Sequence, residues 1–271
     1  MDLTQPSGPA PFHLDLRVLR FRTDPRRDEP AMLAQELLTQ GRLEEAVELT
    51  ERTLEVDPTD ADLLLTHGCA LARLGHLETA QLAFTRAAKR DPEWVEPWVQ
   101  LAEVLLTRGK PTRAVQVIER GLALDPSEPR LVRSQSRATL ELRARAYCEA
   151  PDEGEEPAML ATQLLSAERA DLAFEVTRTA LLAELDDVDL LVAHAKAARA
   201  MGDLDEAISA LRTATYEAQD WAEIWRLLAE AHEAAGESEE ARQAAAKGLL
   251  VDPSDAALIA LHERAETLVT L

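Results

Sequence analysis

The sequence predicts an all-α protein built from stacked helical hairpins, and three observations support this prediction. The chain of 271 residues is rich in Ala and Leu, which are strong helix formers, and its hydrophobic content of 46% is enough to build a core. Only ten glycines and ten Phe, Tyr and Trp residues occur, which argues against a β-sandwich or β-barrel. A pattern with a period of 34 residues recurs along the chain, and such a period indicates a solenoid of repeated units.

Three sets of residues mark the first three repeats at a constant interval of 34 positions. They are Gly41, Gly75 and Gly109, then Ala46, Ala80 and Ala114, then Asp57-Pro58, Asp91-Pro92 and Asp125-Pro126. We therefore predict repeats at 27–60, 61–94 and 95–128. The Gly is suited to end the first helix of a unit, because it adopts the left-handed conformation without strain. The Ala lets two helices cross closely, and the Pro stops the second helix.

This pattern resembles the tetratricopeptide repeat (TPR) family, whose unit is a helix–turn–helix. The resemblance covers 27–128 and, with more departures from the pattern, 154–255. It implies an all-α, right-handed TPR superhelix, that is, an α-α solenoid. It also implies a protein-binding role, although one fold can serve many functions.

A second period of 127 residues indicates that the whole three-repeat block is duplicated. The hexapeptide at 29–34, Glu-Pro-Ala-Met-Leu-Ala, returns unchanged at 156–161, and about 38 of 102 aligned positions are identical without a gap. The second block is therefore predicted to hold repeats at 154–187, 188–221 and 222–255. Glu168 replaces the expected Gly, while Leu185 and Gln219 replace the expected Pro, so we expect some helix endings there to differ.

The residues that precede each block are predicted to be short extended or β segments. Leu14, Leu16 and Val18 alternate with polar residues, as do Leu140, Leu142 and Ala144, and this alternation is typical of a half-buried strand. These arms, at 12–26 and 139–153, are expected to pair with each other, to pack on the solenoid, to mediate self-association, or to add to a partner's sheet by β-augmentation.

The remaining segments complete the predicted organisation. Residues 1–11 are expected to form a flexible tail. Each block is expected to end in a capping helix, since a terminal repeat has no neighbour to cover its apolar face. Block 1 with its cap then spans 27–138, and block 2 with its cap spans 154–271.

Composition and motifs exclude several functional classes. A net charge of −21 argues against nucleic-acid binding, which needs clustered Lys and Arg. Neither a signal peptide nor a membrane span is visible, and Cys69 and Cys148 form no motif, so a cytoplasmic location is expected. We find no nucleophile elbow, phosphate loop or metal-ligand spacing. A non-enzymatic protein without cofactor or metal is therefore expected.

The TPR resemblance implies that partner proteins or peptides bind a concave face lined by the first helix of each repeat. In block 1 the corresponding residues are Gln35, Leu38, Leu65, Cys69, Arg73, Val99, Glu103 and Leu106. In block 2 they are Thr162, Leu165, Val192, Lys196, Arg199, Arg226, Glu230 and Glu233. The first set is mixed to apolar and the second is more charged, so the two blocks are expected to bind different partners.

The acidic balance of the chain suggests a basic partner, but a second explanation fits equally well. An acidic residue occupies the second position of each repeat, for example Asp62, Glu96, Asp189 and Glu223. A carboxylate in the first turn also stabilises a helix through its dipole, whether or not a partner binds. The expected function is a scaffold or adaptor within a larger assembly. The alternative is a secretion or assembly chaperone for a basic, aggregation-prone client.

Overall fold

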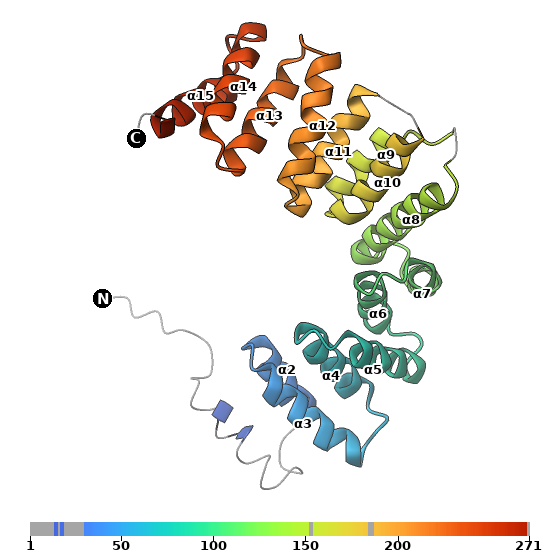
Figure 1. The fold of residues 1–271 in the computed structure, drawn as a ribbon. Helices are drawn as coiled ribbons and strands as arrows, with labels where there is room; N and C mark the ends of the chain where they lie inside the picture. Colours follow the sequence, from blue (N-terminus) through green and yellow to red (C-terminus); the bar gives the residue numbers. More distant parts are fainter. Residues whose placement is uncertain (1–13, 16, 19–29, 152–153, 184–186, 270–271) are drawn as a thin grey trace. The chain divides into compact units, whose positions relative to one another are not determined.

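The computed structural model describes residues 14, 15, 17, 18, 30–151, 154–183 and 187–269. Its helices follow one another along the chain (Figure 1). They are α2 Pro30–Thr39, α3 Leu43–Val56, α4 Ala61–Arg73, α5 Leu77–Arg90, α6 Val95–Thr107, α7 Pro111–Leu124, α8 Pro129–Glu149, α9 Pro157–Ser166, α10 Ala170–Leu182, α11 Val188–Met201, α12 Leu204–Glu217, α13 Ala222–Ala234, α14 Ser238–Val251 and α15 Ala256–Val269. No strand occurs among the described residues. The predicted all-α class is confirmed.

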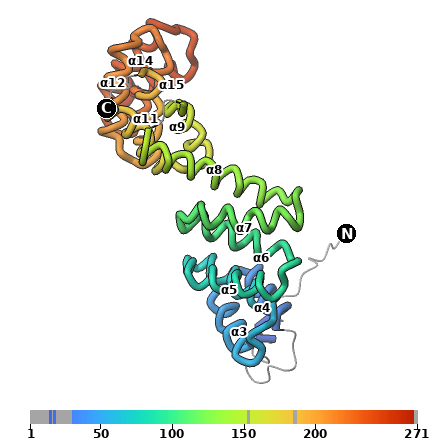
Figure 2. The backbone as a smooth tube through the Cα atoms, turned by 90° about the vertical axis from the view of Figure 1, so that its right-hand side faces the viewer, coloured from blue at the N-terminus to red at the C-terminus, as the bar shows by residue number. Residues whose placement is uncertain are grey.

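The chain divides into two compact units, Met1–Thr139 (unit 1) and Leu140–Leu271 (unit 2). Unit 1 contains the hairpins α2–α3, α4–α5 and α6–α7, and unit 2 contains α9–α10, α11–α12 and α13–α14. The boundary falls within α8, an unbroken helix whose backbone can be followed in Figure 2. Unit 1 thus holds its first half, and unit 2 holds its second.

Small residues let the two helices of each hairpin approach closely. The Ala that marks each repeat is completely or almost completely buried in all six hairpins: Ala46, Ala80, Ala114, Ala173, Ala207 and Ala241. Large side chains fill the space around them, chiefly Leu33, Phe84, Ile118 and Leu131 in unit 1 and Leu160, Leu190, Ile224 and Leu258 in unit 2. Each fully buried side chain of this size contributes about 1.5–3 kcal/mol.

The turn between the helices of a hairpin has the same backbone conformation throughout. Gly41 has φ of 75°, and the other glycines at this position are similarly positive. Glu168, which replaces Gly in α9–α10, also has a positive φ, 57°. The backbone amide of Arg169 donates a hydrogen bond to the Leu164 carbonyl at 2.9 Å, as the amide of Arg42 does to the Leu37 carbonyl. The expected difference in helix ending is therefore wrong here, because Glu168 accepts a strained conformation that costs about 1–2 kcal/mol.

The predicted extended arms are wrong, because the described residues of the first arm, and those of the second arm up to Glu149, are helical. Leu14, Asp15, Arg17 and Val18 have helical backbone, and 139–149 form the end of α8. From Ala138 onward, the buried positions of α8 are Ala138, Glu141, Ala144 and Tyr147, which are spaced by three as on a helix face. The alternating pattern was misleading because apolar residues at i and i+4 fit both the two-residue period of a strand and the 3.6-residue period of a helix. In addition, Glu141 is charged, so the sequence did not indicate that it is buried.

The arm residues that the structure describes consequently pack inside their own units, and these residues offer no free strand edge for β-augmentation. Leu14, Val18 and Ala144 are buried, Leu140 packs against the core of unit 2, and Leu142 is half-buried. Leu16, most of 12–26 and the tail at 1–11 lie outside the described residues.

The same interactions hold both helical segments to the hairpin that follows them. In unit 1, Arg42 pairs with Asp15 at 2.5 Å, and Arg17 pairs with Glu36 at 2.6 Å. In unit 2, Arg169 pairs with Glu141, and Arg143 donates to Gln163 at 3.1 Å. The duplicated sequence thus forms an equivalent opening contact in each unit. One difference matters energetically: the Glu141 side chain is fully buried, whereas that of Asp15 is 58% exposed.

We predict that Gly68→Ala destabilises the protein and that Phe84→Leu largely restores it. A Cβ at position 68 would lie 2.5 Å from the Phe84 ring, a contact that needs repacking at about 1–3 kcal/mol. Unit 2 carries Ala195 and Leu211 at the equivalent positions. Urea unfolding of the two single variants and the double variant measures the coupling. Additive effects would contradict the prediction.

We also predict that Arg169→Met costs about 3–5 kcal/mol, because it leaves the buried Glu141 carboxylate without its arginine. The matched variant, Arg42→Met, should cost about 1 kcal/mol or less, since Asp15 remains in contact with water. Chemical unfolding of both full-length variants provides the comparison. Equal losses would show that the difference in burial does not matter.

Candidate functional site

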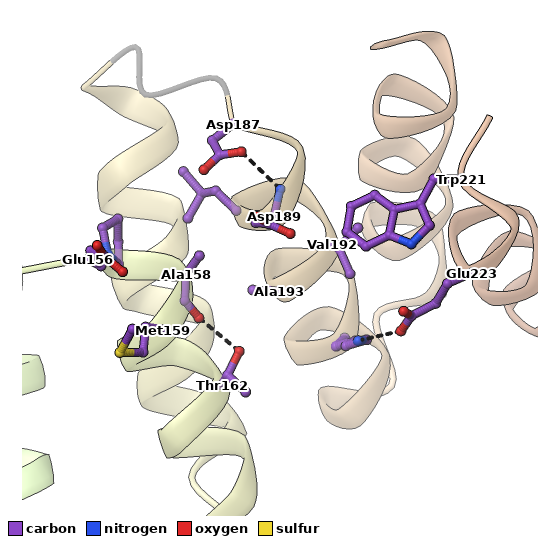
Figure 3. Close-up of a pocket in the computed structure, with 13 residues that line it drawn as sticks. Glu156, Ala158, Met159, Thr162, Asp187, Asp189, Val192, Ala193, Trp221 and Glu223 are labelled. Atoms are coloured by element: carbon purple, nitrogen blue, oxygen red, sulfur yellow. Dashed lines mark hydrogen bonds and ion pairs between the residues drawn. The ribbon is translucent and has the colours of Figure 1, made fainter. Parts of the chain in front are cut away.

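Unit 2 contains a groove lined by the first helices of its hairpins. It has a volume of about 1040 Å³ and lies against α9, α11 and the start of α13 (Figure 3). The apolar part of its lining includes Ala158, Met159, Val192 and Trp221. Met159, in the first turn of α9, is 55% exposed. The groove therefore presents apolar surface to solvent.

Acidic side chains border this groove. Glu156, Asp187, Asp189 and Glu223 line it, with Lys196 as the one basic residue among its lining residues. Asp187 caps α11 by accepting a hydrogen bond from the Asp189 amide at 3.1 Å. Lys196 Nζ lies 3.0 Å from Glu223 Oε1, so its charge is already paired (Figure 3). A positive group on a ligand is therefore electrostatically favoured over a negative one.

The basic residues further along the same face of unit 2 are also paired. Arg226 contacts Glu230 at 2.8 Å, and Arg199 pairs with the same glutamate. Arg264 of α15 bonds to Glu233 at 2.8 Å and lowers the pKa of that carboxyl. These pairs link α11, α13 and α15. Their charges hold neighbouring helices together and are not free for a partner.

The structure places the predicted residues of unit 2 in two groups. Thr162, Val192 and Lys196 line the cavity, whereas Arg199, Arg226, Glu230 and Glu233 belong to the network of pairs. Leu165 is half-buried against the core. Sequence reasoning missed Glu156, Asp187 and Trp221. Each of them directly precedes the first helix of a hairpin. This position could have indicated them, because the N-terminal ends of neighbouring first helices lie together in a stack of hairpins.

In unit 1 the predicted groove residues differ widely in exposure. Gln35 and Arg73 are exposed, and Leu38, Leu65, Cys69 and Glu103 are half-buried. Val99 is completely buried in the core of unit 1, so its assignment to the groove surface is corrected. Leu106 is 2% exposed and lines the bottom of a small cavity of about 290 Å³.

That small cavity is lined by α6 and the first half of α8 and has the opposite balance of charge. Arg130, Arg133 and Arg137 line it together with Glu103. Arg130 also pairs with Glu96 on α6. Burial is the main cause that raises the pKa of Glu103, against the opposing effect of Arg130. Burial and the nearby Glu96 and Glu103 raise the pKa of the Cys69 thiol to about 11.

One constellation has the residue types of a catalytic triad but not its accessibility. His194 Nδ1 lies 2.8 Å from Thr177 Oγ1, and its Nε2 lies 3.0 Å from Glu206. Thr177 is fully buried and its hydroxyl also lies 2.9 Å from the Ala173 carbonyl of its own helix. His194 is 2% exposed and stacks on Phe174. This arrangement joins α10 to α11 and α12, and a substrate has no access to it.

Across the part of the chain that the structure describes, no helix is both long enough and apolar enough to span a bilayer. The same residues contain no group of three or more His, Cys, Asp or Glu side chains placed to hold a metal ion.

Comparison with known families and proteins gives a consistent description. Two sequence models of the family described as "Tetratricopeptide repeat" match the chain, one at residues 65–129 and 192–257, the other at 31–52. The chain is also 36% identical over 89 residues to human tetratricopeptide repeat protein 7A. That alignment covers 33% of this chain and 10% of the relative, so the chain matches only a small part of that protein.

Solved structures with similar helical hairpins share little sequence with this chain. A tetratricopeptide repeat protein from Parabacteroides merdae has 14% identity and a TM-score of 0.43, over 94% of this chain and 98% of its own. The APC/C hetero-tetramer Cut9-Hcn1 has 17% identity and a TM-score of 0.41, over 93% of this chain and 52% of the other. A thermophilic protein from Thermus thermophilus has 21% identity and a TM-score of 0.32, over 89% and 98%.

We predict that Cys69 reacts slowly with iodoacetamide at neutral pH. A thiol with a pKa of about 11 holds roughly 100-fold less thiolate at pH 8 than an ordinary cysteine, so its alkylation should be slower by a similar factor. The rate should keep rising beyond pH 10. Mass spectrometry of the Cys148→Ser variant, with a short unstructured cysteine peptide as the control, gives both rates. A plateau below pH 9 would contradict the predicted effect of burial.

Proposed function

Since the chain belongs to the tetratricopeptide repeat family, we propose that it is a non-enzymatic scaffold or adaptor whose two units bind segments of partner proteins in their grooves. Members of this family generally mediate contacts between proteins, and the more specific role is our inference. The observation that carries it is the cavity of about 1040 Å³ along α9, α11 and α13. A cavity of this size can accommodate several side chains of an extended or helical peptide.

The lining of this cavity favours a partner segment that places Lys or Arg beside an apolar residue. Four carboxylates border the cavity, and its single lysine is paired with one of them. Met159, Val192 and Trp221 supply apolar contact surface. Apolar burial supplies affinity in such a groove, while the carboxylates select the sign of the partner's charge and steer its approach.

The groove of unit 1 supports binding of a different segment. Its exposed and half-buried residues include Leu38, Leu65 and Cys69, and its smaller cavity is lined by three arginines. The two units therefore offer surfaces of different chemistry, which suits a protein that holds more than one partner. Both cysteines are free thiols, which supports the cytoplasmic location included in this proposal.

A charge reversal at Asp189 tests whether its carboxylate serves a partner or only the helix. Asp189→Lys should weaken binding of a Lys- and Leu-containing peptide by about fivefold, equivalent to about 1 kcal/mol. The control is Asp62→Lys, since Asp62 occupies the same first-turn position in unit 1 and carries the same helix-dipole cost. Fluorescence anisotropy on the full chain, using binders chosen from an array of short random peptides, measures both affinities.

Equal effects of the two variants would contradict a partner-binding role for Asp189. Failure of every array peptide to bind the wild-type chain would contradict the groove proposal itself. Affinity capture then separates the two roles considered for the protein: a scaffold retains several folded partners, whereas a chaperone retains a single unfolded basic client.

A further inference from the structure

A second cavity of unit 2 is formed mainly by the second helices of the hairpins, away from the acidic groove. It has a volume of about 450 Å³ and is lined by residues of α12, α13 and α14. These are Arg212, Thr215, Tyr216, Gln219, Trp225, Lys247, Leu250 and Val251. We call the five that carry the argument, Arg212, Tyr216, Trp225, Lys247 and Leu250, the Trp225 surface.

The Trp225 surface is cationic in a chain that has 50 acidic and 29 basic side chains. No carboxylate is among the described residues that line the cavity. Lys247 Nζ lies 5.1 Å from the centre of the Trp225 ring, a cation–π contact that leaves its charge uncompensated. Neither Lys247 nor Arg212 forms an ion pair with a carboxylate of the described residues, in contrast to the paired cations of the groove. A carboxylate on a ligand would supply the missing partner.

Large, solvent-exposed apolar side chains lie beside these cations. Tyr216 is 78% exposed, Leu250 is 85% exposed, and the adjacent Val251 is 38% exposed. Apolar side chains that gather on a surface and are bordered by charge are typical of a protein-binding site, because a partner that covers them removes apolar area from water. The combination favours a ligand with both an apolar side chain and negative charge.

Unit 1 provides an internal comparison, because it contains the equivalent cavity around Trp98. The Trp98 indole donates to the Pro92 carbonyl at 3.2 Å, and the Trp225 indole donates to the Gln219 carbonyl at 2.9 Å. Arg120 lies over the Trp98 ring at 5.7 Å, as Lys247 does over Trp225. The described residues that line this cavity include no carboxylate either.

The two cavities differ in their apolar component. At the positions of Tyr216 and Leu250, unit 1 has Lys89 and Ala123. Both copies thus share the tryptophan with its unpaired cation, and unit 2 alone adds the exposed tyrosine and leucine. Arg212 is also particular to unit 2, since Thr85 stands at its position in unit 1. The shared cation and Arg212 account for charge selection, and the added tyrosine and leucine account for apolar contact.

We propose that the Trp225 surface binds a segment of another protein that carries Asp or Glu beside a large apolar residue. The carboxylates would pair with Arg212 and Lys247, and the apolar side chain would pack on Tyr216, Trp225 and Leu250. This site is separate from the acidic groove and prefers a partner of opposite charge. One unit could therefore hold two dissimilar segments at once.

Peptide selection on the full-length protein tests the proposal. A displayed library of random peptides is panned on the wild-type chain, and the best binder that contains Asp or Glu and Leu, Phe or Trp is synthesised with a fluorescent label. Its affinity is then measured for wild type, for Arg212→Glu/Lys247→Glu and for Tyr216→Ser/Leu250→Ser. Arg178→Glu/Arg242→Glu is the control, because it makes the same change in net charge within unit 2 at residues that do not line the cavity.

We expect at least tenfold weaker binding to the charge-reversed variant, at least fivefold weaker binding to the serine variant, and unchanged affinity for the control. Binding should weaken as salt concentration rises. Equal binding to all variants, or selection that yields no peptide of the proposed composition, would overturn the proposal. So would a wild-type dimer in sedimentation that Arg212→Glu/Lys247→Glu dissociates, because the occupant would then be a second copy of this chain. The groove variant Asp189→Lys should leave this peptide's affinity unchanged, which separates this site from the groove.

Discussion

The close crossing of two helices at a buried alanine is the contact on which the rest of the structure depends. In each hairpin this residue leaves room for the backbones to approach, and large side chains then close the core around it. Repetition of the crossing aligns the first helices along one face and the second helices along another. The acidic groove and the Trp225 surface lie on these different faces of unit 2, so each can have its own chemistry.

Some basic residues of unit 2 form ion pairs that hold its helices together, and others form no ion pair with a described carboxylate. Lys196, Arg199 and Arg226 pair with glutamates on their own or neighbouring helices, which satisfies the basic residues of the groove and leaves carboxylates in excess there. On the second helices, Arg212 and Lys247 have no such partner among the residues that the structure describes. A large negative net charge therefore does not describe every surface of the molecule. The local balance decides which partner segment a face attracts.

The sequence allowed a correct prediction of the features that recur in every repeat. The prediction failed where a segment lies outside the repeats or where its apolar pattern fits both a helix and a strand. The glycine turns and the crossing alanines gave the helical hairpins directly. The arms were assigned wrongly because Leu14 and Val18 fit a helix and a strand equally well, and because the buried residue of the second arm is the charged Glu141. At the candidate site, positional analogy placed Thr162, Val192 and Lys196 at the cavity. In unit 1 the same analogy placed Val99 on the groove surface, although packing in the core buries that residue completely, which single-chain periodicity cannot reveal.

The pair Gly68 and Phe84 also constrains how the duplicated halves can have diverged. In unit 1 the phenylalanine ring fills the core space beside the glycine, whereas in unit 2 Ala195 and Leu211 fill the equivalent space together. A path between these two solutions avoids the steric clash only if the ring is reduced before the methyl group is added. Gene conversion that transferred just one of the two codons would create either an overfilled or an underfilled core. The two positions are therefore coupled: a change at one alters the volume that the other has to fill.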